Sequence, residues 1–405
     1  MRKGQFEGQL LLLITLALVA FGLVMVFSAT SGQATLGNGD ASYYLRKQGL
    51  YALVGLVLLV LLRRTSYRSL RPLAPTLLVG SLGLLLAVLA IGTTVNGAKR
   101  WLQFGPAVFQ PSELAKLALV IWLAAYLARH PAPRTLGELF KPIGLVVGVF
   151  CALFLAEPDL GTAITVVVML GGVLVVSGAP ARLLGSAGVL AVGLVLTVAW
   201  FEPYRRARLL SFINPWDDPQ GAGYQTVQAM IGLGSGGIFG VGLGEGISKN
   251  FYLPEAHTDM IFAIVGEELG LVGTTALIGA YAAFGYAGFR LALGCKDPFG
   301  KRLAAGITTL VCGQALINVA AVMGVAPLTG ITLPFVSYGG SSLIVGLAAV
   351  GILLNIAGDH GRATRAQVPD RGRRNSRTRA SGNRSRRSAS RSRSSRDVRR
   401  VAGSR

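Results

Sequence analysis

Ten apolar runs, each long enough to cross a lipid bilayer, constrain this chain more than any other feature. A transmembrane helix needs about 20 predominantly apolar residues. Hydrophobic residues make up 52% of the chain and charged residues only 14%. We therefore predict an all-α integral membrane protein with about ten transmembrane helices. The predicted spans cover residues 9–30, 47–62, 74–95, 112–129, 142–157, 161–178, 184–201, 259–288, 303–325 and 340–357.

Lysine and arginine in the loops predict how these spans are oriented. Cytoplasmic loops of membrane proteins carry an excess of these two residues. A cytoplasmic N-terminus places most basic loops inside, and it leaves three basic clusters outside, at Arg46-Lys47, Lys99-Arg100 and Arg205–Arg208. Ten spans then return the C-terminus to the cytoplasm. We expect a multi-pass protein of the cytoplasmic membrane with both ends inside.

Two regions lie outside the apolar runs. An extracytoplasmic loop of about residues 202–258 separates the seventh and eighth spans, and we assign it to a transmembrane domain of residues 1–360. Long ordered loops are usually functional. Residues 361–405 are rich in Arg and Ser, with 16 arginines against two aspartates. Such a segment buries too little apolar surface to fold, so we predict a disordered cytoplasmic tail that lies on anionic lipid rather than on nucleic acid.

The sequence just before the eighth span carries three ionisable residues, Glu255, His257 and Asp259. It turns apolar directly after Asp259, so we expect Asp259 in the first turn of a helix, whose N-terminus keeps a carboxylate ionised. An ionised carboxylate at the outer membrane boundary can act as a general base. Helix capping by Asp259 explains the local sequence equally well. His257 either orients Asp259 or a substrate, or forms an ordinary interfacial hydrogen bond.

A second group of charges lies between the third and fourth spans. Pro111 suits the first position of a helix, which places Glu113 in the first turn. Glu113 and Lys116 are three residues apart and share a helix face. They either face a cavity inside the bundle or form a structural ion pair at the helix end. Arg100, beside Trp101, either anchors the chain at the interface or holds a pyrophosphate.

Two further turns carry candidate residues. In Glu157-Pro-Asp-Leu-Gly-Thr162 the proline and glycine explain a tight turn, whereas the two carboxylates are not needed for it. Asp159 either contacts a cation, an arginine or a substrate, or it caps the following helix. The small residues in Leu333-Pro-Phe-Val-Ser-Tyr-Gly-Gly-Ser-Ser342 allow close helix packing. Ser337 and Ser341 in this segment could equally contact a substrate.

Two other patterns are excluded as sites. Gly232-Leu-Gly-Ser-Gly-Gly237 matches a dinucleotide-binding pattern, but no strand precedes it and the loop faces outside. The three cysteines, Cys151, Cys295 and Cys312, form no metal or disulfide motif.

Taken in order, four of these segments are similar to the signature of the SEDS family (shape, elongation, division, sporulation) of bacterial cell-wall polymerases. The resemblance runs from about residue 8 to 357 and covers everything except the tail. Ala256 and Tyr224-Gln225 are more similar to the division members than to the elongation members. The resemblance rests on Asn96-Gly-Ala-Lys-Arg-Trp101 with Gln110-Pro-Ser-Glu-Leu-Ala-Lys116, on Glu157-Pro-Asp-Leu-Gly-Thr162, on Pro254-Glu-Ala-His-Thr-Asp259 with Glu267-Glu-Leu-Gly270, and on Ser337-Tyr-Gly-Gly-Ser-Ser342.

This resemblance implies a fold of ten transmembrane helices and the polymerisation of lipid II, the undecaprenyl-pyrophosphate-linked disaccharide, at the division septum. Asp259 matches the family's essential aspartate. Arg100, Glu113 and Lys116 match its characteristic charges, and Asp159 matches the carboxylate of its Glu-Pro-Asp turn. The partners it implies are a class B penicillin-binding protein transpeptidase and other membrane proteins of the division machinery.

These residues predict a mechanism. Asp259 takes the proton from the 4-hydroxyl of the acceptor sugar as that oxygen attacks the anomeric carbon of the donor chain. Undecaprenyl pyrophosphate leaves, and its charge needs a cation. Arg100 is the first candidate, and Arg205, Arg206 or a divalent cation (Mg²⁺ or Mn²⁺) is the second. The alternatives are a lipid II flippase, which also fits ten spans with buried charges, an elongation polymerase and a non-catalytic scaffold.

Overall fold

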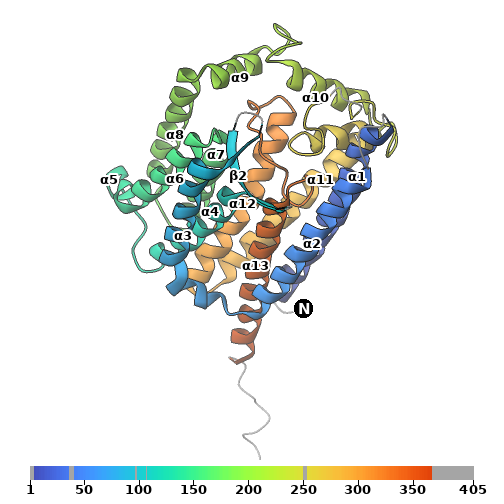
Figure 1. Ribbon diagram of the computed structural model, residues 1–405. Coiled ribbons are helices and arrows are strands. Elements are labelled where there is room, and N and C mark those ends of the chain that lie inside the picture. Colours follow the sequence, from blue (N-terminus) through green and yellow to red (C-terminus); the bar gives the residue numbers. More distant parts are fainter. Residues whose placement is uncertain (1–3, 36–40, 96–97, 106, 250–252, 367–405) are drawn as a thin grey trace, which may run out of the picture. The chain divides into compact units, whose positions relative to one another are not determined.

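The computed structural model describes residues 4–35, 41–95, 98–105, 107–249 and 253–366 (Figure 1). Residues Met1–Arg362 form one compact unit. The predicted tail therefore lies almost entirely outside the described residues. The α-helices are α1 (Gln5–Thr35), α2 (Ala41–Arg64), α3 (Leu70–Ile91), α4 (Pro111–Leu127), α5 (Leu136–Leu139), α6 (Leu145–Ala156), α7 (Leu160–Ser177), α8 (Ala181–Phe201), α9 (Pro203–Ile213), α10 (Tyr224–Ser235), α11 (Ile261–Gly294), α12 (Pro298–Val322) and α13 (Gly340–Ala366). A 3₁₀ helix (Tyr67–Ser69), a π-helix (Phe140–Gly144) and the strands β1 (Thr93–Val95), β2 (Ala98–Phe104) and β3 (Ala107–Phe109) complete the described elements.

Nine helices in the described ranges are long and apolar enough to cross a membrane. They contain α1, α2, α3, α6, α7, α8, α11, α12 and α13, and they correspond to nine of the ten predicted spans. The tenth predicted span, 112–129, corresponds to α4. Its 17 residues lie at the short end of the range for a membrane helix. The prediction of a helical, multi-pass membrane protein is confirmed.

The connection between α3 and α4 contains a small antiparallel sheet that the sequence analysis missed. Its strand order is β1-β2-β3. The prediction of an all-α chain was therefore incomplete. The third span ends at Ile91 because the β-branched residues Thr93–Val95 favour a strand. Side chains alternate between the two faces of a strand, so Arg100 lies on the same face of β2 as the buried Ala98 and Leu102.

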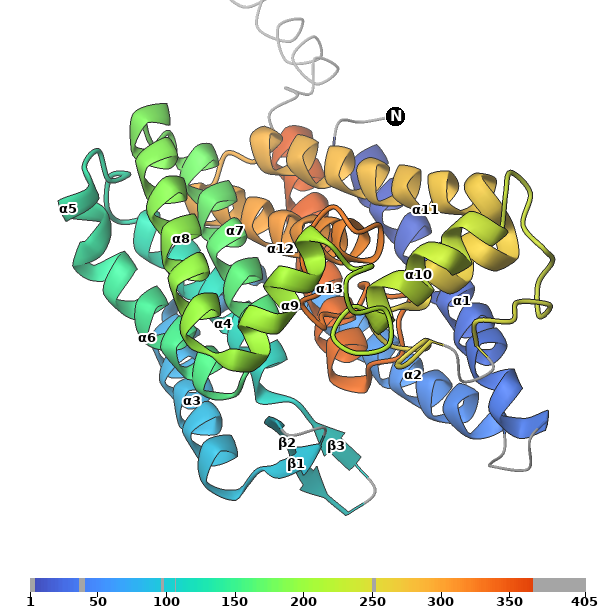
Figure 2. The same ribbon diagram turned by 90° about the horizontal axis from the view of Figure 1, so that it is seen from above.

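The loop between α8 and α11 contains two helices, α9 and α10. Both lie at the end of the unit that also carries the sheet, opposite the first turn of α1 (Figure 1). Figure 2 looks onto this end and shows α10 running along α11.

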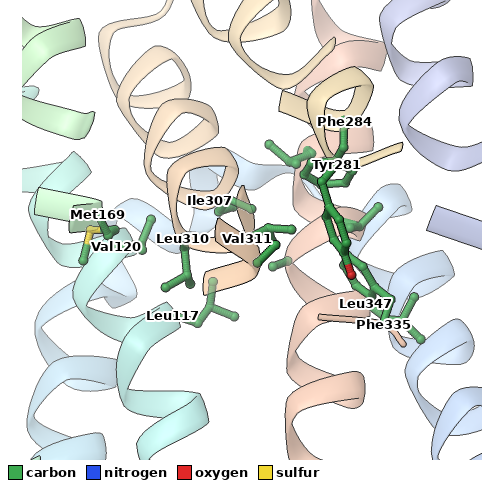
Figure 3. Close-up of a cluster of buried hydrophobic side chains, with 14 of the residues drawn as sticks. Leu117, Val120, Met169, Tyr281, Phe284, Ile307, Leu310, Val311, Phe335 and Leu347 are labelled. Carbon is green, nitrogen blue, oxygen red and sulfur yellow. The ribbon is translucent and has the colours of Figure 1, made fainter. Parts of the chain in front are cut away.

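The core is centred on α12, which lies between α4 and α7 on one side and α11 on the other (Figure 3). Gly306 of α12 allows this close approach, because an added Cβ atom would lie 2.7 Å from a side-chain carbon of Val120 and 2.9 Å from one of Val173. Gly288 of α11 faces Thr308 of α12 at a similarly short distance. Small residues at such crossings let membrane helices pack closely. Because α12 is packed closely on several sides, polar side chains on it are held in fixed positions.

Candidate active site

Asp259 lies in a series of turns, residues 253–260, that leads into α11. The backbone amides of Thr258 and Met260 both donate to the carbonyl of Glu255, at 3.0 Å and 3.4 Å. These turns delay the helix, so its first residue is Ile261 and its N-cap is Met260. The prediction that Asp259 lies in the first turn of the span is therefore wrong. Asp259 does not cap α11 either.

The backbone of Asp259 is fixed from the side by α12. The side-chain amide nitrogen of Asn318 donates to the carbonyl of Asp259 at 2.7 Å and to the carbonyl of Ile331 at 2.8 Å. Asn318 is 2% exposed. Its amide therefore joins the turn before α11 to the connection between α12 and α13, inside the protein.

His257 packs against two aromatic rings, which also contact each other. Its ring centroid is 4.9 Å from that of Tyr44 and 5.5 Å from that of Tyr338. The backbone carbonyl of His257 accepts from the amide of Tyr338 at 2.9 Å. Burial lowers the pKa of the His257 imidazole, against the raising effect of the Glu255 charge. An imidazole packed against two tyrosine rings holds this turn in place, which favours the orienting interpretation of His257.

The electrostatics of Asp259 suit a base. The pKa of its carboxyl is raised to about 6, first by burial and then by the negative charge of Glu255, against the lowering effect of the Arg208 guanidinium. The Thr258 hydroxyl lies 3.3 Å from one of its oxygens. A base works best when its pKa lies near the working pH. Burial, and not a helix N-terminus, sets the basicity of this carboxylate.

Glu113 and Lys116 form a second buried group. Pro111 opens α4 and Glu113 lies in its first turn, as predicted. The Lys116 ammonium lies 2.8 Å from a carboxylate oxygen of Glu113 and 2.8 Å from the side-chain oxygen of Gln314 on α12. Lys116 is 2% exposed. A small cavity of about 30 Å³, lined by Glu113, Lys116 and Gln314 among others, opens beside the pair.

Two amides on one face of α12 link the two groups. Gln314 and Asn318 are four residues apart, which places them on the same side of a helix. The side-chain nitrogen of Gln314 donates to the carbonyl of Thr332 at 2.9 Å, next to the Ile331 carbonyl that Asn318 holds. Neither residue was predicted from the sequence. Polar side chains inside an apolar span are a signal of function, and this pair carries that signal.

The segment 328–333, between α12 and α13, also contacts Arg208 and the start of α7. The Arg208 guanidinium donates to the carbonyl of Leu328 at 3.4 Å. Gly161, at the start of α7, packs against this segment, since an added Cβ atom would lie 2.9 Å from the carbonyl of Thr329. Arg208 was not singled out in the sequence. Its neighbours Arg205 and Arg206 contact the Leu155 carbonyl and the Trp200 ring instead.

Arg100 and Asp159 take local roles around the turn between α6 and α7. The Arg100 guanidinium donates to the carbonyls of Glu157, at 3.0 Å, and Pro158. Asp159 caps α7, because its carboxylate accepts from the amide of Thr162 at 3.0 Å and from its hydroxyl at 2.8 Å. The capping interpretation of Asp159 therefore describes its contacts.

Glu157 differs from its neighbours. It lies just past the membrane span that ends at Ala156, and it is 0% exposed. Neither carboxylate oxygen has a hydrogen-bond partner among the described residues. The pKa of this carboxyl is raised to about 8, mainly by burial and then by the charge of Asp159, while Arg100 lowers it. Glu157 is therefore largely protonated at neutral pH.

The two candidate serines hold backbone segments together. The Ser337 hydroxyl accepts from the amide of Leu333 at 2.8 Å, and the Ser341 hydroxyl accepts from the amide of Gln110 at 2.9 Å. The second bond ties the entry of α4 to the entry of α13. These contacts support the packing interpretation of both serines.

Neither a cluster of metal-ligating side chains nor the size of a cavity identifies this site among the described residues. In the part of the chain that the structure describes, no three His, Cys, Asp or Glu side chains gather as metal ligands. The divalent cation stays a prediction. A cavity of about 900 Å³ lies at the other end of the spans, where it is lined by residues such as Gln9, Arg63 and Asn355. It is remote from Asp259, so size alone does not identify the site.

Comparison with protein families gives a match over almost the whole described body. A family model for FtsW, RodA and SpoVE, described as "Cell cycle protein", matches residues 9–361. The chain belongs to this family. The SEDS resemblance predicted from the motifs is confirmed.

Named relatives and solved structures agree with this membership. The chain is 42% identical over 350 residues to a probable peptidoglycan glycosyltransferase FtsW of Geobacter sulfurreducens, covering 86% of this chain and 94% of the relative. It is 39% identical over 358 residues to the stage V sporulation protein E of Bacillus subtilis, covering 86% and 96%. The predicted enzyme class, a peptidoglycan glycosyltransferase, is confirmed by these matches.

Two solved structures share the fold. A chain from a structure described as structural coordination of polymerization and crosslinking by a peptidoglycan synthase complex has a TM-score of 0.72 and 34% identity, covering 86% of this chain and 97% of that one. The Thermus thermophilus rod shape determining protein RodA has a TM-score of 0.65 and 32% identity, covering 86% and 96%.

Proposed function

We propose that this glycosyltransferase polymerises lipid II into glycan strands at the outer face of the cytoplasmic membrane, with Asp259 as the general base. One observation carries the assignment. Asp259 is a partly buried carboxylate whose backbone is fixed by Asn318 and whose pKa is raised to about 6. Such a group is ionised at neutral pH and basic enough to accept a proton from a sugar hydroxyl.

The reaction follows from this placement. The 4-hydroxyl of the acceptor sugar loses its proton to the Asp259 carboxylate while its oxygen forms a bond to the anomeric carbon of the donor. The bond between that carbon and the pyrophosphate oxygen breaks, and undecaprenyl pyrophosphate leaves. Positive charge stabilises this leaving group. Arg208 is the cation whose charge reaches Asp259, and Arg100 is the second candidate, since its guanidinium lies at the same end of the spans.

Position and partners belong to the same proposal. The loop charges support cytoplasmic ends and an extracytoplasmic site. The relatives named FtsW support a role at the division septum. The synthase complex among the structural neighbours supports a class B penicillin-binding protein as partner, with other membrane proteins of the division machinery around it.

A flippase is the rival from another class. It needs polar groups along the whole bilayer depth. The buried polar chain from Glu113 through Lys116 and Gln314 to Thr332 instead connects to the segment beside Asp259, at the end of the spans that carries the sheet. This arrangement favours an enzyme at one face of the membrane.

Purified protein with fluorescent lipid II tests the proposal. Formation of glycan polymer, separated by gel and sensitive to a muramidase, is the expected result. Movement of lipid II across a vesicle membrane without polymer would identify a flippase. A folded preparation that shows neither activity, even with the transpeptidase partner added, would identify a non-catalytic scaffold and overturn the enzyme assignment.

A further inference from the structure

The segment that follows α10 exposes an unusual number of apolar side chains. Between residues 236 and 249, Ile238 is 62% exposed, Phe239 82%, Leu243 55% and Ile247 65%. Val241 is exposed as well. Single exposed apolar residues are common, but a contiguous patch marks a contact with a partner or a membrane. We call the side chains of Ile238, Phe239, Val241 and Leu243 the apolar patch.

The backbone of this segment is inserted into a break in α11. At Gly270 the helix has non-helical dihedral angles, with φ 65° and ψ −159°. The amides freed after the break, of Leu271 and Val272, donate to the carbonyls of Gly237 and Ile238 at 2.9 Å and 3.1 Å. In lipid, a broken helix is tolerated only where its freed backbone groups find such partners.

The segment also donates hydrogen bonds to the carbonyls that precede the break. The amides of Val241 and Gly242 donate to the carbonyls of Glu267 and Glu268 at 3.0 Å and 3.1 Å. The segment and the helix therefore satisfy each other's backbone, as neighbouring strands do in a sheet. This pairing leaves the segment as a fixed part of the helical body.

Glycine is required for so close an approach. A Cβ atom added to Gly236 would lie 1.9 Å from the carbonyl of Gly266, and one added to Gly240 would lie 2.1 Å from that of Glu268. Gly240 also has φ 80°, a value that other residues rarely adopt. The glycine-rich sequence is thus explained by contact with α11.

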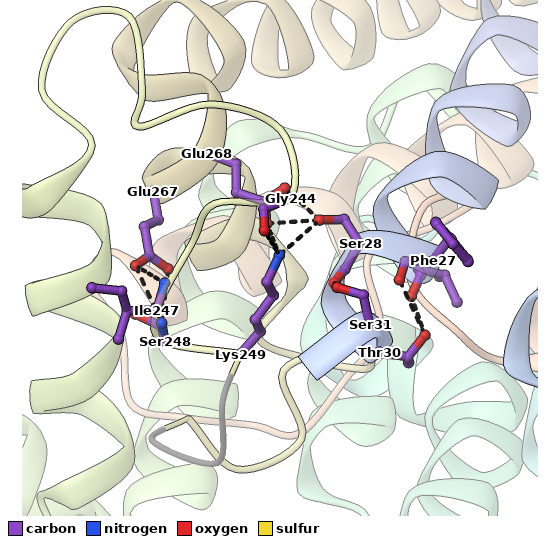
Figure 4. Close-up of polar contacts among 11 residues, drawn as sticks. Phe27, Ser28, Thr30, Ser31, Gly244, Ile247, Ser248, Lys249, Glu267 and Glu268 are labelled. Atoms are coloured by element: carbon purple, nitrogen blue, oxygen red, sulfur yellow. Dashed lines mark hydrogen bonds and ion pairs between the residues drawn. The ribbon is translucent and has the colours of Figure 1, made fainter. Parts of the chain in front are cut away.

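The charges at the base of the segment are neutralised locally (Figure 4). The buried Lys249 ammonium lies 2.9 Å from a carboxylate oxygen of Glu268, which also accepts from the hydroxyl of Ser28 on α1 at 2.6 Å. Glu267 accepts from the amides of Ile247 and Ser248. Paired charges and satisfied amides are what a site of low polarity demands.

The apolar patch is continuous with the membrane surface of α11. Leu271 and Val272, to which the segment is bonded, are 58% and 52% exposed and belong to a membrane-spanning helix. Gly270 lies 20 residues before Arg290, which corresponds to about 30 Å of helix, the thickness of the hydrocarbon layer. The break in α11 therefore falls at the outer boundary of that layer.

From these contacts we propose that residues 237–243 are a membrane-inserted element, whose apolar patch lies among the lipids of the outer leaflet. The partner is the bilayer itself, at the depth where acyl chains meet headgroups. Glu245, which is exposed, marks the edge that returns to the headgroups. The loop of about 202–258 is then only partly aqueous.

Fluorescence quenching in proteoliposomes tests this placement. The full chain, with its three native cysteines replaced by alanine, receives a single cysteine that carries a nitrobenzoxadiazole probe. Phe239→Cys is the test position. Gln220→Cys, in an exposed polar part of the same loop, is the aqueous control, and Ile278→Cys on the exposed side of α11 is the lipid control.

The probe at position 239 should be quenched by doxyl-labelled phospholipid to an extent close to that at position 278. It should be several-fold less accessible to aqueous iodide than the probe at position 220. Iodide quenching equal to that of the aqueous control would overturn the proposal. Protection from both quenchers would overturn it as well, because protein would then cover the patch. Leu243→Cys gives the same test if the first variant does not fold.

Discussion

The side-chain nitrogen of Asn318 lies 2.7 Å from the backbone carbonyl oxygen of Asp259. This bond joins the helix at the centre of the core to the residue proposed as the base. The same nitrogen donates to Ile331, and Gln314, one turn earlier, holds the neighbouring Thr332 and the Lys116 ammonium. One face of α12 therefore positions both polar groups of the site.

Asn318→Ala should reduce polymerisation by slowing turnover more than by weakening substrate binding. The change leaves two buried carbonyls without a donor, each at a cost of about 1–3 kcal/mol, and it frees the backbone that carries Asp259. Steady-state kinetics with varied lipid II separate the two effects. Asn355→Ala is the matched control, since Asn355 also donates to a backbone carbonyl, that of Arg63 at 2.7 Å, far from the site. Equal loss of activity in both variants would reduce Asn318 to a structural role.

Glu113 and Lys116 should behave as a coupled pair. Either single change to Ala leaves the other charge buried without its partner, which costs about 3–5 kcal/mol. Each should therefore lower thermal stability and polymerase activity. Exchanging the two residues should restore part of both, because the ion pair can form again. Silent single variants, measured by melting in detergent and by the polymer assay, would show that the pair is only a feature of the helix end.

The sequence predicted the spans well because a membrane helix needs a long apolar run and nothing else. It predicted Glu113 in the first turn of α4 because Pro111 opens a helix. It failed where position depends on distant contacts. The start of α11 is set by turns that close on Glu255, and the β-strands are too short to leave a clear pattern.

The sequence predicted the charged residues of the candidate site, but not the neutral residues that hold them in position. Asp259, Glu113 and Lys116 stand out because charges are costly in a membrane. Gln314 and Asn318 are neutral, so their signal in the sequence is weaker, and the carbonyls that they bond in the folded protein show which role they have. Arg208 was hidden among neighbouring arginines, and only the fold separates it from Arg205.

Lys249 and Glu268 should show strong coupling in a double-mutant cycle. Lys249→Met leaves the fully buried Glu268 carboxylate with only the Ser28 hydroxyl as a hydrogen-bond donor among the described residues, so it should lower the melting temperature markedly. Lys249→Met combined with Glu268→Met removes both charges and should be milder than the sum of the single changes. Additive losses would contradict a direct ion pair. Lys47→Met, on a partly exposed lysine near the start of α2, controls for loss of a basic residue.

Glu157→Gln should stabilise the protein at alkaline pH. The pKa of Glu157 is raised from 4.5 to about 8, so the fold favours its protonated form and stability falls as the pH rises between these values. Glutamine keeps the shape and cannot ionise. Melting curves at pH 6 and pH 8.5 should therefore differ less for the variant than for the natural chain. A larger pH dependence in the variant would refute the assignment of a neutral Glu157.

Asp259→Asn should abolish polymerisation while the protein still folds and binds its partner. Asparagine keeps the size of the side chain but cannot accept the proton, and loss of a general base costs roughly 10²–10⁴-fold in rate. The readout is polymer formed from fluorescent lipid II, with melting temperature as the control for folding. A near-normal rate would remove Asp259 from the mechanism, and Asp159 and Glu255 would then be tested.

The dependence of the rate on pH gives a sharper test, because two neighbouring residues shift the pKa of Asp259 in opposite directions. With a pKa near 6, Asp259 is ionised above that pH, so kcat/KM should fall as the pH drops through about 6. Glu255 raises the pKa of Asp259 and Arg208 lowers it. Glu255→Gln should therefore move the acidic limb of the profile to lower pH, and Arg208→Gln should move it to higher pH. A purely structural role for either residue would change the height of the profile and leave its midpoint in place. If both midpoints stay where they are in the natural chain, the group that titrates is not Asp259.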